Sequence, residues 1–286
     1  MTSRLIRLLC AALLLSHVVP TWGQSMLRRS ELGINGGGMN YLGDLNGQSM
    51  LGKLSVAAGG VYRINFDNRW SMCLGASYGH VEGGNPDIIA RRNLSFRSFI
   101  GEGWVRAEFN FLPFGRAADD FSWTPYIFGG LGFFAFNPQA QYKSPVSGTL
   151  EWYDLQPMGT EGQGLAQYPD RTKYSLIQGM FPFGLGIRYI PFEFVTFAVE
   201  YGFRKTWTDY IDDVSTTYVD GSLFSSDITS RLADRSGEVE PGYVNAPGIK
   251  RGDDSLDDWY AYLNLSITVR MDKILFWVGK KRCDLK

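Results

Sequence analysis

The sequence predicts an all-β fold, an eight-stranded antiparallel transmembrane barrel of the outer-membrane type with long extracellular loops. Three observations predict it. Apolar and polar residues alternate along at least seven of eight strand-like stretches, charges avoid the apolar positions, and long connections alternate with short ones. The alternation has the two-residue period of a strand that faces lipid on one side and the barrel interior on the other. The 34 glycines and the 15% of aromatic residues suit a large β protein with ample apolar mass to bury.

The overall composition excludes several other classes of protein. The formal net charge is −1, from 28 Lys and Arg against 29 Asp and Glu, which argues against a dedicated nucleic-acid-binding protein. Three cysteines are too few for a disulfide scaffold. Beyond the N-terminal segment, no apolar run approaches the roughly 18–20 residues of a membrane-spanning helix. If the chain spans a membrane, it therefore does so with strands.

Residues 1–23 have the pattern of a secretory signal peptide. Two arginines precede an apolar run at residues 8–19, which is too short to span a bilayer as a permanent helix. We therefore expect an exported protein whose mature part, residues 24–286, forms one outer-membrane barrel domain. A short basic tail at about residues 272–286 is expected on the periplasmic side.

The first three strands are expected at about residues 30–42, 54–66 and 70–80. In each, apolar residues at every second position alternate with polar or small ones. The apolar face of the third strand carries Trp70 and Tyr78 near its two ends, which suits the aromatic girdles at the two membrane interfaces.

The fourth and fifth strands are expected at about residues 94–111 and 123–136. In the fourth, apolar residues such as Phe109 alternate with charged residues such as Arg106 and Glu108. The fifth is apolar on both faces, so the sequence does not assign its lipid-facing side.

The last three strands are expected at about residues 176–189, 194–207 and 258–271. Each sets an apolar face against a face that carries an arginine. All eight strands are long enough for the roughly 9–11 residues that a tilted membrane-spanning strand needs.

The connections between strands sort into two sets that alternate along the chain. The long set comprises residues 43–53, 81–93, 137–175 and 208–257, and the short set comprises residues 67–69, 112–122 and 190–193. Long loops outside and short turns in the periplasm are the layout of an outer-membrane barrel, whereas a β-sandwich has no reason to sort its loops this way. The even number of strands places both ends of the barrel on the periplasmic side.

If the apolar faces contact lipid, the opposite faces carry charges into the barrel interior. A charge that faces lipid near mid-bilayer costs roughly 2–4 kcal/mol, so this placement supports the assignment of faces. An eight-stranded barrel is wide enough only for its own side chains, which favours a plugging ion-pair network over a proton or ion path. The predicted network comprises Glu102, Arg106, Glu108, Arg188, Glu200, Arg204 and Arg270. The same alternation places Glu31 and Arg63 on the inner face.

Candidate catalytic groups are few. His80 lies near Glu82 at the outer end of the third strand, but no serine stands at a spacing that demands a catalytic triad. We therefore expect an interfacial histidine here. We expect no catalytic residue, cofactor or metal, and a protein that is not an enzyme.

Acidic residues follow the seventh strand. Asp209, Asp212 and Asp213 cluster there, and they either bind Ca²⁺ or form the solvated start of an acidic loop. We favour the solvated loop, because the spacing is not that of an EF-hand. Residues 251–253 spell Arg-Gly-Asp, a match too short to indicate adhesion.

Apolar and basic residues near the C-terminus form a candidate docking tail for a periplasmic partner. The alternative is that the apolar run extends the last strand while the basic side chains reach the membrane interface. The tail residues are Phe276, Trp277, Lys280, Lys281, Arg282 and Cys283. Cys283 has no evident partner in the chain, which suggests an intermolecular disulfide in an oxidising compartment.

Three parts of the sequence carry a resemblance to a known family. They are residues 31–37 with 41–45, residues 155–164, and residues 187–189 with 200–215. Together they resemble the PorG-like outer-membrane β-barrel proteins of the type IX secretion system, over essentially the whole mature chain. The motif residues in loops are Gly159, Glu161, Gly162, Asp209, Tyr210, Asp212 and Asp213.

The resemblance implies a non-enzymatic component of a protein-secretion machine in the cell outer membrane of a Gram-negative bacterium. In the family, the barrel associates with a periplasmic ring built of a lipoprotein and a partner protein, and the machine moves folded cargo across the outer membrane. The expected partners are this ring lipoprotein and its partner, with outer-membrane lipid around the barrel and no nucleic acid. A surface-binding or lipid-modifying enzymatic role of the extracellular loops is the alternative.

Overall fold

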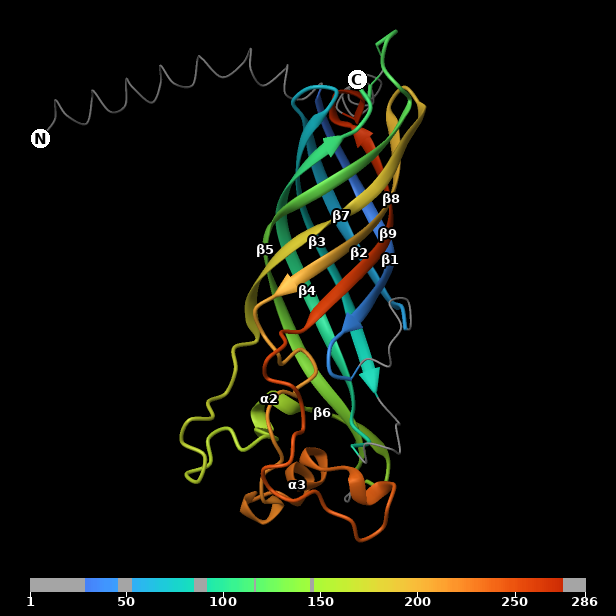
Figure 1. Cartoon of the computed structure of the whole chain (residues 1–286). Helices are drawn as coiled ribbons and strands as arrows, with labels where there is room; N and C mark the ends of the chain where they lie inside the picture. Colours follow the sequence, from blue (N-terminus) through green and yellow to red (C-terminus); the bar gives the residue numbers. More distant parts are fainter. Residues whose placement is uncertain (1–28, 46–52, 85–91, 116, 145–146, 275–286) are drawn as a thin grey trace, which may run out of the picture.

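The computed structural model describes residues 29–45, 53–84, 92–115, 117–144 and 147–274. Eight long antiparallel strands close into a barrel in which each pairs with its neighbours and β1 pairs with β9 (Figure 1). The barrel strands are β1 Ser30–Leu42, β2 Ser55–Asn65, β3 Trp70–Gly84, β4 Ser95–Asn110, β5 Trp123–Lys143, β7 Ile177–Phe192, β8 Val195–Thr206 and β9 Trp259–Arg270. The predicted eight-stranded barrel is confirmed.

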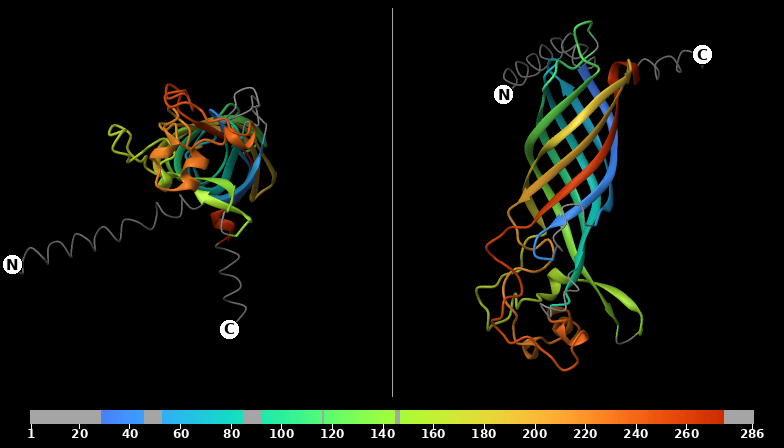
Figure 2. Two further views of the ribbon diagram at one scale, coloured as in Figure 1. Left: turned by 90° about the horizontal axis from the view of Figure 1, so that it is seen from below. Right: turned by 45° about the vertical axis from the view of Figure 1, so that its right-hand side comes forward.

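A ninth strand, β6 Leu150–Asp154, forms a hairpin with the outer part of β5. The sequence prediction ended the fifth strand at residue 136 and left this region as a loop, whereas β5 continues to Lys143. The hairpin projects beyond the barrel (Figure 2). It is held in part by Arg97, whose guanidinium lies 3.8 Å from the ring centre of Trp152.

The two ends of the barrel differ in the way the sequence predicts. β1 begins and β9 ends at the same end, where the connections are short, and we call this the turn end (Figure 1). The opposite end, the loop end, carries the long connections. In an outer-membrane barrel the turn end is periplasmic and the loop end is extracellular.

Two of the long connections fold into what we call the cap, residues 155–176 and 207–258. It contains α2 Leu155–Met158, the 3₁₀ turns Gly221–Leu223 and Ser236–Glu238, and α3 Asp227–Ala233. Viewed along the barrel axis, the segment 207–258 lies over part of the barrel end, and part of the segment 155–176 projects to the side (Figure 2). Within the described part of the chain, no helix has the length and apolar character needed to cross a membrane.

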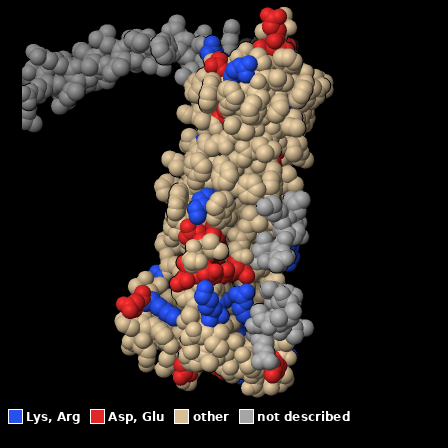
Figure 3. Space-filling model, in the orientation of Figure 1, with Lys and Arg blue, Asp and Glu red and all other residues tan. Residues whose placement is uncertain are grey.

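The barrel wall is apolar outside and polar inside. Large apolar side chains point outward and stay exposed, for example Ile34 at 69%, Leu131 at 68% and Leu265 at 63%. On the face shown in Figure 3, charged side chains gather toward the two ends and leave a broad uncharged band along the barrel. This band suits a lipid-facing surface.

Glycines on the inner face make room for large inward side chains. A Cβ at Gly75 would lie 2.3 Å from the ring of Trp104, and a Cβ at Gly186 would lie 2.8 Å from the ring of Tyr126. The aromatic rings therefore occupy the space that side chains at these positions would fill.

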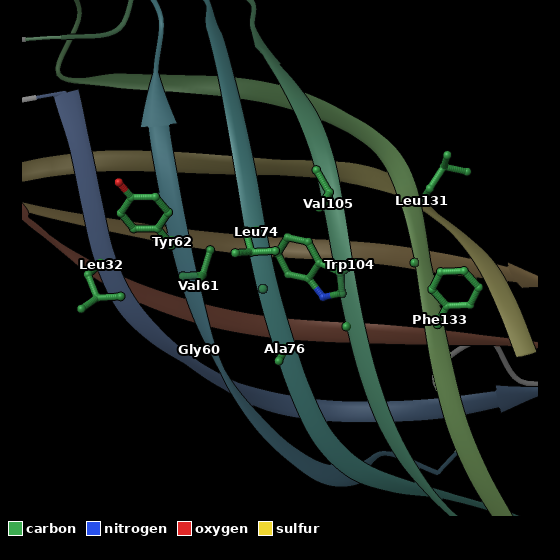
Figure 4. Close-up of a pocket in the computed structure, with 13 residues that line it drawn as sticks. Leu32, Gly60, Val61, Tyr62, Leu74, Ala76, Trp104, Val105, Leu131 and Phe133 are labelled. Atoms are coloured by element: carbon green, nitrogen blue, oxygen red, sulfur yellow. The ribbon is translucent and has the colours of Figure 1, made fainter. Parts of the chain in front are cut away.

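One side of the outer wall is hollowed. The hollow has a volume of about 730 Å³. Figure 4 shows the large apolar side chains around it. The small residues Gly60, Ala76 and Gly103 also line it. A Cβ at Gly103 would meet no atom within 4 Å, so barrel packing does not require glycine there.

Candidate functional site

The barrel interior holds four guanidinium groups and four carboxylates, each no more than 4% exposed. They come from five strands, because the two-residue period directs every second side chain inward. We call these eight residues the core network. They are Glu31, Arg63, Glu102, Arg106, Glu108, Arg188, Glu200 and Arg204.

Glu108 on β4 lies at the centre of the core network and binds three arginines. Its Oε2 atom accepts hydrogen bonds from Arg63 Nε at 2.9 Å and from Arg188 Nη2 at 2.5 Å. Its Oε1 atom accepts from Arg106 Nε at 3.0 Å and Nη2 at 2.8 Å. One carboxylate therefore joins strands β2, β4 and β7.

Two further ion pairs extend the core network. Arg106 donates Nη1 to Glu200 Oε2 at 3.0 Å and Nη2 to Glu200 Oε1 at 2.5 Å. Arg204 donates Nε and Nη2 to the two oxygens of Glu102 at 3.2 and 3.0 Å. Tyr260 Oη donates to Glu102 Oε2 at 2.7 Å. These bidentate contacts fix the side chains in one geometry.

Aromatic rings cover the guanidinium planes of the core network. Arg106 lies 4.4 Å from the ring centre of Trp104 and 4.0 Å from that of Phe128. Arg188 lies 3.8 Å from the ring centre of Tyr126. Cation–π contacts of this kind stabilise a desolvated guanidinium beyond its ion pairs.

Little free space remains in the middle of the core network, whereas Glu31 borders a hollow of about 380 Å³ that Arg270 also lines. A cavity of about 10 Å³ lies beside Arg106, Glu200 and Arg204, and this is about the room that one water molecule needs. The charges therefore pack as a plug in this part of the barrel. Because the four positive and four negative groups are buried together, removing one partner leaves an uncompensated charge.

The sequence also predicts Arg270 in the network, and the structure corrects this prediction. Arg270 ends β9 at the turn end, where its Nε and Nη2 atoms bind Asp272 at 3.1 and 2.5 Å. Its side chain is 19% exposed. The alternation assigns a residue to the inner or outer face of the barrel, but it does not give the position of the side chain along the barrel axis.

A second buried cluster lies in the cap and contains the loop residues of the family motif. Glu161 is fully buried and accepts backbone N–H bonds from Ser215 at 2.9 Å and from Thr216 at 3.0 Å. Arg251 Nη1 donates to Glu161 Oε1 at 3.0 Å. Gly159 and Gly162 have φ angles of 65° and 86°, which glycine adopts readily. The two motif segments of the cap are thus packed against each other.

Asp213 connects the same two segments. It accepts hydrogen bonds from Thr160 Oγ1 and, at 2.6 Å, from Tyr174 Oη. Its backbone oxygen accepts from Arg251 Nη1 at 2.5 Å. Burial raises the pKa of Asp213 to about 6, although the charge of Arg251 opposes the rise. Next to it, Tyr210 stacks on Tyr174 with ring centres 4.4 Å apart.

The prediction of a solvated acidic loop start after the seventh strand is wrong. Asp209, Asp212 and Asp213 are 9%, 1% and 0% exposed. The reason is that the cap folds over these residues, while distant hydroxyl groups donate to two of them, Tyr41 of β1 to Asp212 and Thr160 to Asp213. Burial raises the pKa values of Asp209 and Asp212 to about 8. Among the described residues, no group of three or more His, Cys, Asp or Glu side chains could hold a metal ion.

The Arg-Gly-Asp tripeptide at residues 251–253 is not exposed in the way that an adhesion motif needs to be. Arg251 is only 2% exposed, and its Nε atom donates to the backbone oxygen of Ala233 at 3.1 Å. Its guanidinium serves the buried cluster around Glu161.

The remaining sequence candidates do not come together. The ring of His80 packs against Phe99 with ring centres 5.7 Å apart, while Glu82 pairs with Lys53 at 3.0 Å. Cys73 is a buried free thiol inside the barrel. The candidate docking tail lies outside the described residues, with Phe276, Trp277, Lys280, Lys281, Arg282 and Cys283.

Sequence reasoning missed several functional partners. Tyr260 lies on the predicted inner face of the last strand, and this position was the signal that it could bind a buried carboxylate. Tyr41 belongs to the first family motif, but nothing local indicates that its hydroxyl reaches Asp212 and Asp258. Arg251 was assigned only to the tripeptide.

The fold and the two buried clusters define the class of this protein. It is a closed eight-stranded transmembrane β-barrel of the outer-membrane type, with an apolar exterior, a charge-paired interior and a folded cap at its loop end. Residues 7–147 match the family model described as "Domain of unknown function (DUF6089)".

Several solved outer-membrane proteins are similar to this chain. Neisserial surface protein A is 8% identical with a TM-score of 0.39, over 84% of this chain and 96% of that one. OprG from Pseudomonas aeruginosa is 12% identical with a TM-score of 0.39, over 85% and 97%. Ail from Yersinia pestis is 12% identical with a TM-score of 0.37, over 84% and 96%. No curated protein sequence matches the chain.

Proposed function

We propose that this protein is a non-enzymatic outer-membrane component of a type IX protein secretion machine, which anchors or positions the periplasmic ring at the outer membrane. In this proposal residues 1–23 direct export and the mature chain is an integral protein of the cell outer membrane. The observation that carries it is the packing of the two PorG-like cap segments on each other through Glu161, which binds Ser215 and Thr216. The residues of the resemblance thus form one structural unit rather than scattered matches.

The plugged interior supports an anchoring role over a transport role. Four arginines and four glutamates fill the middle of the interior beside a cavity of only about 10 Å³, and buried apolar side chains such as Met39 and Phe134 pack in the interior as well. Folded cargo is far larger than any passage through eight strands, whose interior is just wide enough for side chains. In this proposal cargo crosses elsewhere in the machine, and the barrel supplies a fixed point in the membrane.

The periplasmic partners are the ring lipoprotein and its partner protein, and the C-terminal tail is the proposed docking segment. Its apolar residues Phe276 and Trp277 precede the basic residues 280–282 in the sequence. This order suits contact with an apolar and acidic surface. Cys283 is the proposed site of an intermolecular disulfide.

Co-purification from mildly solubilised outer membranes tests the proposal. The tagged full-length barrel should bring down two periplasmic ring proteins, and its deletion should leave secreted cargo in the periplasm. Trp277→Ala combined with Lys281→Glu should weaken the co-purification, whereas the matched pair Trp207→Ala and Lys205→Glu near the loop end should not. Normal secretion by the deletion strain would refute the secretion role.

A surface-binding or lipid-modifying role is the second candidate, favoured by the cap itself. A loop region with buried carboxylates and a buried arginine is a built structure rather than a passive connection. Binding of intact cells to host or matrix ligands, compared between the wild type and a strain with residues 218–248 deleted, tests the binding form. A lipid profile altered by His80→Ala would support the enzymatic form.

A further inference from the structure

The hydroxyl group of Tyr41 lies between two buried carboxyl groups. Tyr41 Oη is 2.6 Å from Asp212 Oδ2 and 2.5 Å from Asp258 Oδ1. A tyrosine hydroxyl has one hydrogen and donates it to one acceptor. The second short contact therefore requires a hydrogen on a carboxyl group, so the three groups together hold two protons rather than one.

The two carboxyl groups use their other oxygen atoms to hold the backbone of the cap. Asp258 Oδ2 accepts from the N–H of Ile211 at 2.9 Å, and Asp212 Oδ1 accepts from the N–H of Val214 at 2.9 Å. The N–H of Asp258 donates to the backbone oxygen of Thr208 at 2.9 Å. We call Tyr41, Asp212 and Asp258 the triad. The triad ties both ends of the segment 207–258 to each other and to the end of β1.

The surroundings of the triad provide little compensation for a second negative charge. Tyr41, Asp212 and Asp258 are each no more than 1% exposed. The charge of Arg251 lowers the pKa of Asp212, whereas the charge of Asp44 raises it and the charge of Asp209 raises the pKa of Asp258. Packed against Tyr41 from β4 is the uncharged ring of Phe96, with ring centres 4.8 Å apart. The nearby Glu161 of the other cap segment is already bound to Arg251.

We propose that Tyr41, Asp212 and Asp258 form a proton-dependent latch that closes the cap segment 207–258 onto the barrel and releases it when the shared carboxyl proton is lost. Loss of that proton places two carboxylates against one hydroxyl, which can bond to only one of them. The freed carboxylate then repels its neighbour in a site of low polarity. This inference does not depend on the secretion role of the barrel.

The direction of the pH effect follows from burial. Burial raises the pKa of Asp212 to about 8 and raises that of Asp258 well above its usual range, with the charge of Asp212 as the second cause. A raised pKa in the closed state means that closure is fully favoured below about pH 4, the pKa of an exposed carboxyl. Closure then weakens by about tenfold per pH unit for the one linked proton, until about pH 8.

Hydrogen exchange of the full-length barrel in detergent, measured from pH 5 to pH 9, tests the latch. The variants are Asp258→Asn and Asp212→Asn, because an amide keeps one oxygen for the backbone N–H and supplies a permanent hydrogen to Tyr41. Comparing each variant with the wild type at the same pH removes the intrinsic pH dependence of exchange. The control is Asp254→Asn, which replaces an exposed acid of the same segment.

Relative to the wild type, the amide variants should protect the amides of residues 208–217 increasingly well as the pH rises from 5, and their advantage should be at least tenfold larger at pH 8 than at pH 5. The control should follow the wild type throughout. Equal protection of wild type and both variants at pH 8 would overturn the latch. Failure of both amide variants to form a heat-modifiable barrel would also overturn it, because the amide provides the hydrogen that the latch requires.

Discussion

Arg106 of β4 donates two hydrogen bonds to Glu200 of β8 across the barrel interior, although β4 and β8 are not neighbouring strands. The same guanidinium also binds Glu108 on its own strand. Contacts of this kind brace the wall from inside, so the barrel does not rely on strand pairing alone. They also explain how a barrel with charged inner faces can fill its lumen without an unpaired charge.

Replacing the central carboxylate of the core network should destabilise the barrel strongly. Glu108→Gln leaves Arg63, Arg106 and Arg188 with one negative partner fewer in a buried site. We expect a loss of about 3–5 kcal/mol in the free energy of unfolding, as for other broken buried ion pairs. Urea titration of the barrel in detergent, followed by its shift in mobility on unheated gels, measures the loss.

The control for this prediction is Glu193→Gln in the turn between β7 and β8, where the carboxylate side chain is 70% exposed. The free energy of unfolding of this variant should stay within about 0.5 kcal/mol of the wild-type value. An equally small effect of Glu108→Gln would show that the buried arginines find other compensation.

The cap should open when its central carboxylate is removed, while the barrel remains folded. Glu161→Gln removes the charge that Arg251 binds at 3.0 Å and weakens the acceptor for Ser215 and Thr216. We expect faster proteolytic cleavage within residues 155–176 and 207–258, with unchanged heat modifiability. The neighbouring substitution Lys250→Ala, at a side chain 71% exposed, should leave the cleavage rate as it is in the wild type.

The barrel strands could be predicted from the sequence, whereas the contacts within the cap could not. The alternation was sufficient to predict seven of the eight barrel strands and to place Glu108 and Arg106 inside, because lipid and lumen impose a two-residue period. The fifth strand, apolar on both faces, was predicted without an assignment of its sides. The cap has no such period. Glu161 and Arg251 are 90 positions apart, and their contact depends on the three-dimensional course of two loops. The burial of Asp212 and Asp213 was therefore beyond the reach of local pattern.

A second pH-dependent group lies in the cap beside the latch. Burial raises the pKa of Asp209 to about 8, so its contribution to cap stability is complete below about pH 4 and is lost as the pH rises to about 8. Asp209→Asn removes this titration. The slope of cap opening against pH, measured by hydrogen exchange between pH 5 and pH 8, should decrease relative to the wild type.

Asp209→Asn and Asp258→Asn each remove one titrating carboxyl group, and their effects should add only in part, because the charge of Asp209 raises the pKa of Asp258. The double variant should therefore have a flatter pH profile than either single variant. A slope in Asp209→Asn as steep as in the wild type would mean that Asp209 is ionised in the closed cap.

Two glycines on adjacent strands should respond in opposite ways to the same added methyl group. Gly75 of β3 and Gly103 of β4 are both within the barrel wall, but a Cβ at Gly75 would lie 2.3 Å from the ring of Trp104, whereas a Cβ at Gly103 would meet nothing within 4 Å. Gly75→Ala forces the indole out of its place beside Arg106 and should cost about 1–3 kcal/mol. Gly103→Ala only restricts the unfolded chain and should be neutral or stabilise the barrel by up to about 1 kcal/mol. Urea midpoints of the two variants, measured side by side, decide the matter, and a neutral Gly75→Ala would mean that Trp104 has a second place to pack inside the barrel.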